Sequence, residues 1–297
     1  MIDPKILFGL VAASSLTLAA CADEDASEDD PTPSGMASLA LSFDGLEPLG
    51  ADYVYEGWII VDGAPVTSGR FTDVSTELTF DIPQDQADGT TTFVLTIEPA
   101  VGDDPAPSDV HVVAGDFTDG VANLTVGHPA ALGDDFANAA GSYILETPTT
   151  HDLADDFDQG VWFLNPPAAM GEMPTASLDL PTLPAGWQYE GWVVGPDGAP
   201  VSTGTFLSGV GADSDGPGDA AGPDGAPPFP GQDFIDPASV LSGYAVVISI
   251  EPMPDDSPAP FAFKPLVDMS ADATAAGMSE PLENMASTLA TGTATFN

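Results

Sequence analysis

The sequence predicts an all-β protein, with two immunoglobulin-like β-sandwich modules in tandem after a signal peptide and a disordered tether. Three observations predict this class. Short apolar runs are separated by Gly, Pro and Asp, helical periodicity is nearly absent, and one motif occurs twice in the same order. Short strands with turn residues at close spacing are typical of sandwiches.

The first segment, 1–20, has the features of a bacterial lipoprotein signal peptide. Its apolar run, 6–20, is shorter than the roughly 20 residues of a membrane span and ends in small residues. It stops at Leu18-Ala19-Ala20-Cys21, which resembles a lipobox, in which the cysteine is acylated and becomes the new N-terminus. Cys21, the only cysteine in the chain, is therefore the predicted lipidation site. We expect a lipid-anchored protein outside the cytoplasm, on the periplasmic or the cell-surface face.

The next segment, 21–36, is acidic, poor in bulky apolar side chains and rich in Pro and Gly near its end. Such a composition cannot bury enough surface to fold, so we expect a disordered tether. The first sandwich module is predicted at 37–128, a linker at 129–140 and the second module at 141–297.

Seven short strands are expected in the first module. Each run is apolar or alternates between apolar and polar residues, and each is bounded by Gly, Pro or Asp. The runs are 39–43, 54–61, 66–71, 77–82, 91–98, 110–114 and 122–126. Asp62-Gly63 lies between the second and third runs, where it supplies the positive φ angles of a tight hairpin.

The repeated motif identifies the second module. Tyr55-Glu56-Gly57-Trp58 returns as Tyr189-Glu190-Gly191-Trp192, and Asp-Gly-Ala-Pro-Val follows both copies. Each copy then has an apolar run that closes on Ile-Glu-Pro, at 97–99 and at 250–252. Matches this long in the same order indicate an internal repeat.

The second copy is longer than the first. It carries an acidic insertion rich in Gly and Pro at 209–233, which we expect to be a surface loop. Two additional strands are expected around 143–145 and 161–164, and short helices at 271–276 and 281–289.

The charge balance excludes one class of partner. The chain has 47 Asp and Glu against 3 Lys and Arg, which gives a net charge of −44. Nucleic acid is therefore not an expected partner, because binding phosphates requires basic patches. Unpaired carboxylates repel one another, and salt at about 1 M shortens the screening length to about 3 Å. We predict a halophilic protein whose melting temperature rises between roughly 0.1 M and 2 M KCl.

The acidic insertion contains a partial calcium-loop pattern. Asp213, Asp215, Gly216 and Asp219 match positions 3, 5, 6 and 9 of such a loop. The first and last ligand positions are glycines, so Asp224 would have to supply a ligand from a loop of another shape. The alternatives are a calcium site and a solvated, salt-adapted loop, and no other cofactor is expected.

The recurrent carboxylates, Glu56 with Glu190 and Glu98 with Glu251, suggest a second kind of chemistry. Glycosidases use two carboxylates about 5 to 10 Å apart. A chain with 47 acidic residues will contain such pairs by accident, and a Glu before Pro has a structural reason to end a strand. We therefore predict no catalytic residue.

The repeated aromatic residues are the remaining candidates. Tyr55 and Tyr189 lie three residues before the Trp of each copy, hence on the opposite face of a regular strand. If the Trp residues face the core, the Tyr residues face outward beside Glu56 and Glu190. These four residues would then be partner contacts, whereas core packing of the Tyr residues is the alternative.

The motif resembles a known family. Tyr-x-x-Trp, the Asp-Gly hairpin with Pro-Val, Gly-x-Phe and the run closing on Ile-Glu-Pro are similar to the C-terminal extracytoplasmic domain of anti-sigma-K factors. The clearest stretch is 93–115, and the likeness covers 38–126, with weaker agreement in the second copy. The resemblance implies an extracytoplasmic, non-enzymatic module. The family's sigma-binding segment and transmembrane helix are not found ahead of it, so direct sigma sequestration is not expected.

The leading functional hypothesis is a non-catalytic envelope lipoprotein that binds or senses a partner, an envelope protein or a polysaccharide, outside the cytoplasm. The alternatives are a structural or adhesive cell-surface protein and a calcium-dependent or carboxylate-based hydrolase.

Overall fold

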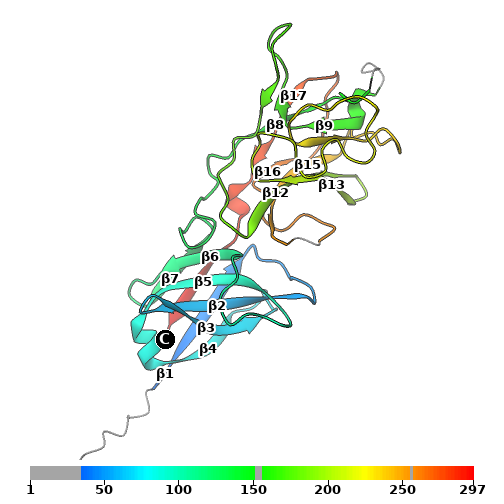
Figure 1. Cartoon of the computed structure of the whole chain (residues 1–297). Coiled ribbons are helices and arrows are strands. Elements are labelled where there is room, and N and C mark those ends of the chain that lie inside the picture. Colours follow the sequence, from blue (N-terminus) through cyan, green and yellow to red (C-terminus); the bar gives the residue numbers. More distant parts are fainter. Residues whose placement is uncertain (1–34, 151–155, 255–256) are drawn as a thin grey trace, which may run out of the picture. The chain divides into compact units, whose positions relative to one another are not determined.

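The computed structural model describes residues 35–150, 156–254 and 257–297. The predicted signal peptide, the lipidation site at Cys21 and nearly all of the tether at 21–36 lie outside the described residues. The rest is almost entirely strand and loop (Figure 1), which confirms the predicted all-β class.

All seven strands expected in the first module are present. They are β1 (Met36–Asp44), β2 (Tyr53–Val61), β3 (Ala64–Phe71), β4 (Leu78–Pro83), β5 (Thr90–Pro99), β6 (His111–Asp116) and β7 (Val121–Thr125). Asp62 and Gly63 form the β2–β3 hairpin with positive φ angles, as their sequence predicts. A short helix, α1 (Gln84–Gly89), precedes β5 and was not expected.

These strands form one sheet that folds over on itself. With β19 (Thr291–Phe296) as an eighth strand, its order is β3-β2-β5-β6-β7-β19-β1-β4, and β6 and β7 are joined by the single pair Ala114 and Thr125. The two ends of this order face each other, because Phe43 of β1 stacks on Phe71 of β3 at 5.7 Å and Phe80 of β4 lies 6.3 Å from the same ring. The main core therefore lies between two four-stranded halves, as in a sandwich.

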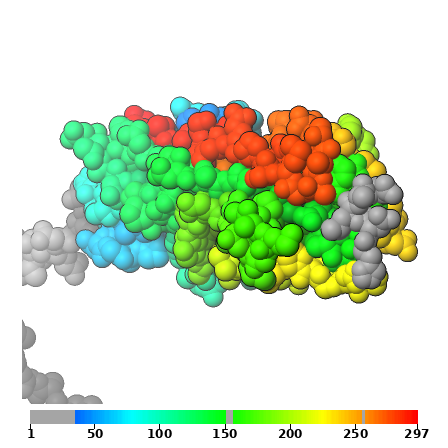
Figure 2. All heavy atoms as spheres, turned by 90° about the horizontal axis from the view of Figure 1, so that it is seen from above, coloured from blue at the N-terminus to red at the C-terminus, as the bar shows by residue number. Residues whose placement is uncertain are grey.

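The last strand of the chain, β19 (Thr291–Phe296), belongs to the first sheet. It lies between β7 and β1, where Ala294 pairs with both Ala122 and Leu41. Figures 1 and 2 show the red C-terminal segment beside the blue start of the first module. The expected second module, 141–297, therefore contributes its final strand to the first sheet.

The second module is built on two further sheets and a short ribbon. Its strands are β8 (Ser142–Leu145), β9 (Gly160–Trp162), β10 (Leu164–Asn165), β11 (Thr175–Ala176), β12 (Trp187–Val194), β13 (Pro200–Phe206), β14 (Gly231–Asp233), β15 (Ala245–Pro252), β16 (Leu266–Asp268), β17 (Ser279–Pro281) and β18 (Glu283–Asn284). One sheet has the order β13-β12-β15-β16-β18 and the other β14-β9-β8-β17, while β10 pairs with β11. The strands expected near 143–145 and 161–164 are thus present as β8 and β9.

Two local expectations in this module are wrong. The segments 271–276 and 281–289 hold no α-helix; the second contains β18 and a single 3-10 turn, η2 (Ala286–Thr288). The insertion at 209–233 is not entirely a surface loop, because its last three residues form β14 and are buried. Asp233 of β14 accepts hydrogen bonds from Trp162 Nε1 at 2.7 Å and from the Thr149 amide at 3.0 Å, which fix the end of the insertion in the sheet.

Candidate functional site

The tyrosines of the repeated motif lie in the main core. Tyr55 and Tyr189 are both 0 % exposed, and each stacks on a phenylalanine at 5.7 Å, Phe71 in the first copy and Phe206 in the second. Their hydroxyl groups donate to backbone carbonyls eight residues earlier in the chain. The expectation that these tyrosines face outward is therefore wrong, and their packing against the core is the reason.

The tryptophans occupy the opposite face of the same strands, as alternation requires. Trp58 and Trp192 are nonetheless buried, because each lies in a small separate cluster covered by other parts of the chain. Ala131 covers the first, and Val267 lies against the second. The motif thus fills both faces of its strand.

A chain of hydrogen bonds leads from each tryptophan to the glutamate of Ile-Glu-Pro. In the first copy, Trp58 Nε1 donates to Thr96 Oγ1 at 2.9 Å and the Thr96 hydroxyl donates to Glu98. The Ser108 amide also donates to Glu98 at 2.8 Å. Burial raises the pKa of Glu98, while the bonds from Thr96 and Ser108 oppose the shift.

The second copy repeats this chain with conservative changes. Trp192 Nε1 donates to Ser249 Oγ at 2.8 Å, and the Ser249 hydroxyl donates to Glu251. The Phe261 amide donates to Glu251 at 2.9 Å, in the role that Ser108 has in the first copy. Both glutamates are fully buried within a hydrogen-bonded network, as a buried polar group must be.

Glu56 and Glu190, also predicted as partner contacts, are buried too. Each accepts a hydrogen bond from a hydroxyl on the neighbouring strand, Thr67 in the first copy and Ser202 in the second. Arg70 adds an ion pair to Glu56 at 3.4 Å. The four residues expected to form a partner surface are therefore part of the protein interior.

The aspartates of the predicted calcium loop do not gather as a metal site. Within the described ranges, no three His, Cys, Asp or Glu side chains are placed to hold a metal ion. Asp213 turns toward β14, where the Gly231 amide donates to its carboxylate at 2.8 Å, and burial raises its pKa to about 7. Asp215 and Asp219 are exposed and Asp224 is half-buried.

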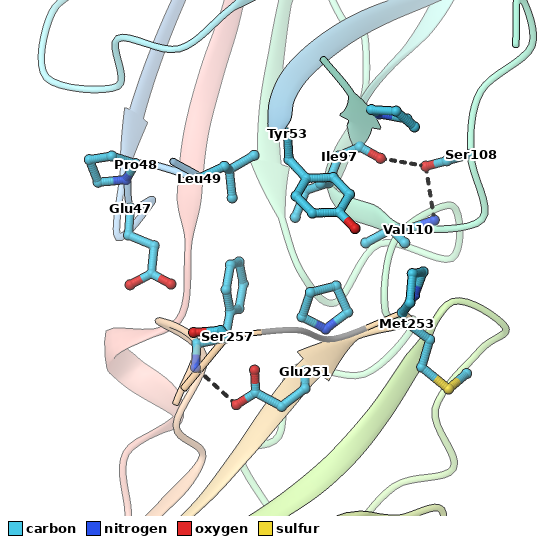
Figure 3. A pocket seen from close by; sticks show the side chains of 14 residues that line it. Glu47, Pro48, Leu49, Tyr53, Ile97, Ser108, Val110, Glu251, Met253 and Ser257 are labelled. Atoms are coloured by element: carbon cyan, nitrogen blue, oxygen red, sulfur yellow. Dashed lines mark hydrogen bonds between the residues drawn. The ribbon is translucent and has the colours of Figure 1, made fainter. Parts of the chain in front are cut away.

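A cavity lies where the two Ile-Glu-Pro ends meet, and we call it the Ile-Glu-Pro pocket. Its volume is about 220 Å³. The strand ends of β5 and β15 line it together with the segment between β1 and β2 (Figure 3). Its apolar walls include Leu49, Ile97, Pro99, Val110, Pro252 and Phe261.

Five polar side chains line this pocket, namely those of Glu47, Tyr53, Ser108, Glu251 and Ser257. Glu47 accepts a hydrogen bond from the Ala262 amide at 3.1 Å, and burial raises its pKa while the nearby Lys264 opposes the shift. Glu251 is the buried glutamate of the second Ile-Glu-Pro. Tyr53 is half-buried, and within the described part of the chain its hydroxyl has no hydrogen-bond partner.

Both basic side chains of the described residues lie beside the pocket. Arg70 donates to the Pro99 carbonyl, and Lys264 donates to the Phe261 carbonyl at 2.6 Å. Burial lowers the pKa of Lys264, whereas Glu47 and Glu251 raise it. In a chain with 47 acidic residues, the two cations thus stabilise the walls of one cavity.

An apolar cavity with a few convergent polar groups is the usual form of a ligand site. The repeat in the sequence indicates Glu251 and Pro252 but carries no signal for Glu47 and Tyr53. Glu47 and Tyr53 lie outside the residues that the two copies share. They come together with Glu251 because the two Ile-Glu-Pro strand ends lie close to one another in the fold.

Comparison with known protein families gives a match that covers the first copy of the motif and not the second. The model of the family described as anti-sigma-K factor rskA, C-terminal, matches residues 26–111, which confirms the resemblance found in the sequence. The match ends at the start of β6, and the second copy of the motif lies outside it. Comparison with curated proteins gives no significant match, and neither does comparison with solved structures. Within the described residues, no helix has the length and apolar character needed to cross a membrane.

Proposed function

We propose that the protein is a lipid-anchored, non-catalytic regulator of the cell envelope that binds or senses a protein partner outside the cytoplasm. The observation that carries this proposal is the match of residues 26–111 to the C-terminal domain of anti-sigma-K factors. Anti-sigma factors regulate through protein contacts, and the matched part contains β1 to β5 of the first module with the first copy of the buried motif.

The buried motif supports a binding role over a catalytic one. Its recurrent glutamates, Glu98 and Glu251, are buried and accept hydrogen bonds from chains that begin at a tryptophan, so they stabilise the strand ends. Two half-buried polar side chains, Glu47 and Tyr53, line the Ile-Glu-Pro pocket, which lies at the ends of strands. Acylation of Cys21 would place this framework at the membrane surface, since two or more acyl chains hold a protein there durably.

Fractionation and mass spectrometry test the anchor. We expect the full chain in the membrane fraction, with Cys21 acylated at the new N-terminus, and a Cys21→Ser variant in the soluble extracytoplasmic fraction. Recovery of both proteins in the same soluble fraction, or an unmodified Cys21, would contradict the anchor.

Affinity capture from membranes tests the regulatory role. In molar salt, which screens non-specific attraction between charges, we expect co-purification of a membrane regulator or protease. The matched control is a Tyr53→Ala, Leu49→Asp double variant, which alters the pocket and leaves the buried motif intact. Exclusive recovery of polysaccharide, or of further copies of the chain, would support a structural or adhesive role instead.

A further inference from the structure

The Ile-Glu-Pro pocket has the walls of a site for an aliphatic chain. Leucine, isoleucine, valine and proline supply half of its lining residues, Met253 adds a further apolar side chain, and aromatic surface comes from Phe261 and Tyr53. Apolar walls favour an apolar occupant, because each Å² of apolar surface that is buried contributes about 25 cal/mol to the free energy of binding. The small volume, about 220 Å³, fits a short chain and excludes a large ring system.

Two half-buried side chains of the pocket, Glu47 and Tyr53, carry an oxygen that can accept a hydrogen bond from an occupant. The carboxylate of Glu47 is half-buried and receives one protein hydrogen bond, to Oε1, so Oε2 is available to a donor. The Tyr53 hydroxyl has no partner within the described residues, and the Tyr53 side chain lines the same pocket as Glu47 (Figure 3). Donors on an occupant would find both oxygens.

The charges around the pocket leave a net negative excess. Among the described residues, Lys264 is the one Lys or Arg that interacts with Glu47 and Glu251, and its ammonium already donates to the Phe261 carbonyl. Arg70 is held by Glu56 and by Asp103, the latter at 3.5 Å, so it does not offset this excess. A positively charged group in the pocket would neutralise this excess negative charge. The net charge of the whole chain, −44, also attracts cations to the protein.

We infer that the Ile-Glu-Pro pocket binds an alkylammonium group, that is, a protonated primary amine on a short aliphatic chain. The methylenes would lie against Leu49, Ile97 and Val110, and the ammonium would donate to Glu47 and Tyr53. A carboxylate or phosphate ligand would meet the two glutamates and be repelled. A quaternary ammonium has no N–H donor and would leave both acceptors without partners.

This chemistry has two natural sources, a free amine and a lysine side chain of a partner protein. The second source rests on the proposed function, whereas the first does not. Binding is measured by calorimetry on the full chain in detergent, with 1,4-diaminobutane as the free amine and a lysine-containing peptide as the protein source. n-Butanol and tetramethylammonium are the controls for the aliphatic chain and for the charge alone.

We expect both amines to bind and both controls to bind at least about tenfold more weakly, as one charge-assisted hydrogen bond provides. Preference for the peptide identifies a protein as the source, and preference for the diamine identifies a free amine. Equal binding of butanol and diaminobutane, or no binding by either amine, would overturn the inference. Neither outcome bears on acylation of Cys21, so failure here is distinct from failure of the membrane anchor.

Single substitutions locate the site. Glu47→Gln removes the charge and keeps the shape, so we expect about tenfold weaker amine binding. Glu77→Gln, at an exposed position outside the pocket, makes the same change in net charge and should leave binding unchanged. Tyr53→Phe removes the unpaired hydroxyl without altering the ring and should weaken binding severalfold. Unaltered melting temperatures show that the variants fold, and equal effects of Glu47→Gln and Glu77→Gln would refute the location.

Discussion

The two copies of the motif differ at their edges and agree in their interior. In both, a tyrosine stacks on a phenylalanine at 5.7 Å in the main core, and a tryptophan on the other face donates through a hydroxyl to a buried glutamate. The strand order around the motif is also equivalent, β3-β2-β5-β6 in one and β13-β12-β15-β16 in the other. The interior therefore specifies the fold of each copy.

The edges show what each copy has acquired. Arg70 pairs with Glu56 in the first copy, whereas Thr205 lies opposite Glu190 in the second. The second copy has the insertion that ends in β14, and the first sheet has β19, which comes from the far end of the chain. The residues that the two copies share therefore build the fold, whereas the ion pair, the insertion and the added strand distinguish one copy from the other.

Truncation of the stacked tyrosines tests the equivalence of the two copies most strongly. We expect Tyr55→Ala and Tyr189→Ala each to lower the free energy of unfolding by about 3 to 5 kcal/mol, because each leaves a cavity and removes a ring contact. Urea unfolding at high salt measures the loss, and Tyr244→Ala, at a half-buried position, is the control with a smaller effect. A large loss in one copy and almost none in the other would break the equivalence.

The final strand tests whether the first sheet depends on the second module's end. Ala294 is fully buried between β7 and β1, so Ala294→Asp places an unpaired charge there and should cost about 3 kcal/mol or more. Thr293→Asp, on the exposed face of the same strand, should cost less than about 1 kcal/mol. Similar losses in urea unfolding of the two variants would show that β19 is not packed in this sheet.

The indole hydrogen bonds give a smaller and matched pair of effects. Trp58→Phe and Trp192→Phe each remove a donor from a buried hydroxyl, so we expect losses of about 1 to 2 kcal/mol in the free energy of unfolding. In a Thr96→Val background, Trp58→Phe should cost less, because the acceptor has gone. Additive losses in this double-mutant cycle would separate the tryptophan from the hydrogen-bond chain.

We expect the acidic insertion of the second copy, through Asp213, to make the free energy of unfolding depend on pH; the first copy has no such insertion. Burial raises the pKa of Asp213 from 3.8 to about 7, so the folded state binds this proton more tightly than the unfolded state. The protonated Asp213 carboxyl therefore contributes to the free energy of unfolding fully below about pH 4, and this contribution is lost as the pH rises to about 7. Its slope is at most about 1.4 kcal/mol per pH unit, and partial exposure reduces it.

Asp213→Asn should flatten this part of the stability curve, measured by urea midpoints between about pH 4 and pH 8. Asp219→Asn is the matched control, because Asp219 lies exposed in the same insertion. If the two variants show identical pH profiles, Asp213 does not retain its proton on folding.

Local pattern was sufficient to predict the strands of the first module. Alternating residues such as Leu39 and Leu41 and the Asp62-Gly63 hairpin act over short distances, and the structure has each strand where its pattern indicates. The final strand was missed for the same reason. Its sequence, TGTATF, is small and polar, and its only large side chain is Phe296, so it has no apolar signal of its own.

The faces of the motif strands could not be assigned from alternation. Spacing correctly placed Tyr55 and Trp58 on opposite faces, but both faces are buried, because residues from other parts of the chain cover the tryptophan. Alternation along a strand indicates which residues lie on the same face of the sheet. It does not indicate which other part of the chain packs on that face.

The sequence by itself determined the strand-rich class, the repeat, the hairpins and the likeness of its first part to the anti-sigma-K C-terminal family. These are properties of residues close together in the chain. Only the tertiary structure decided that β19 completes the first sheet and that the two Ile-Glu-Pro ends enclose one pocket with Glu47 and Tyr53. Both depend on residues that are far apart in sequence, and the contacts between such residues are set by which surfaces can be buried together.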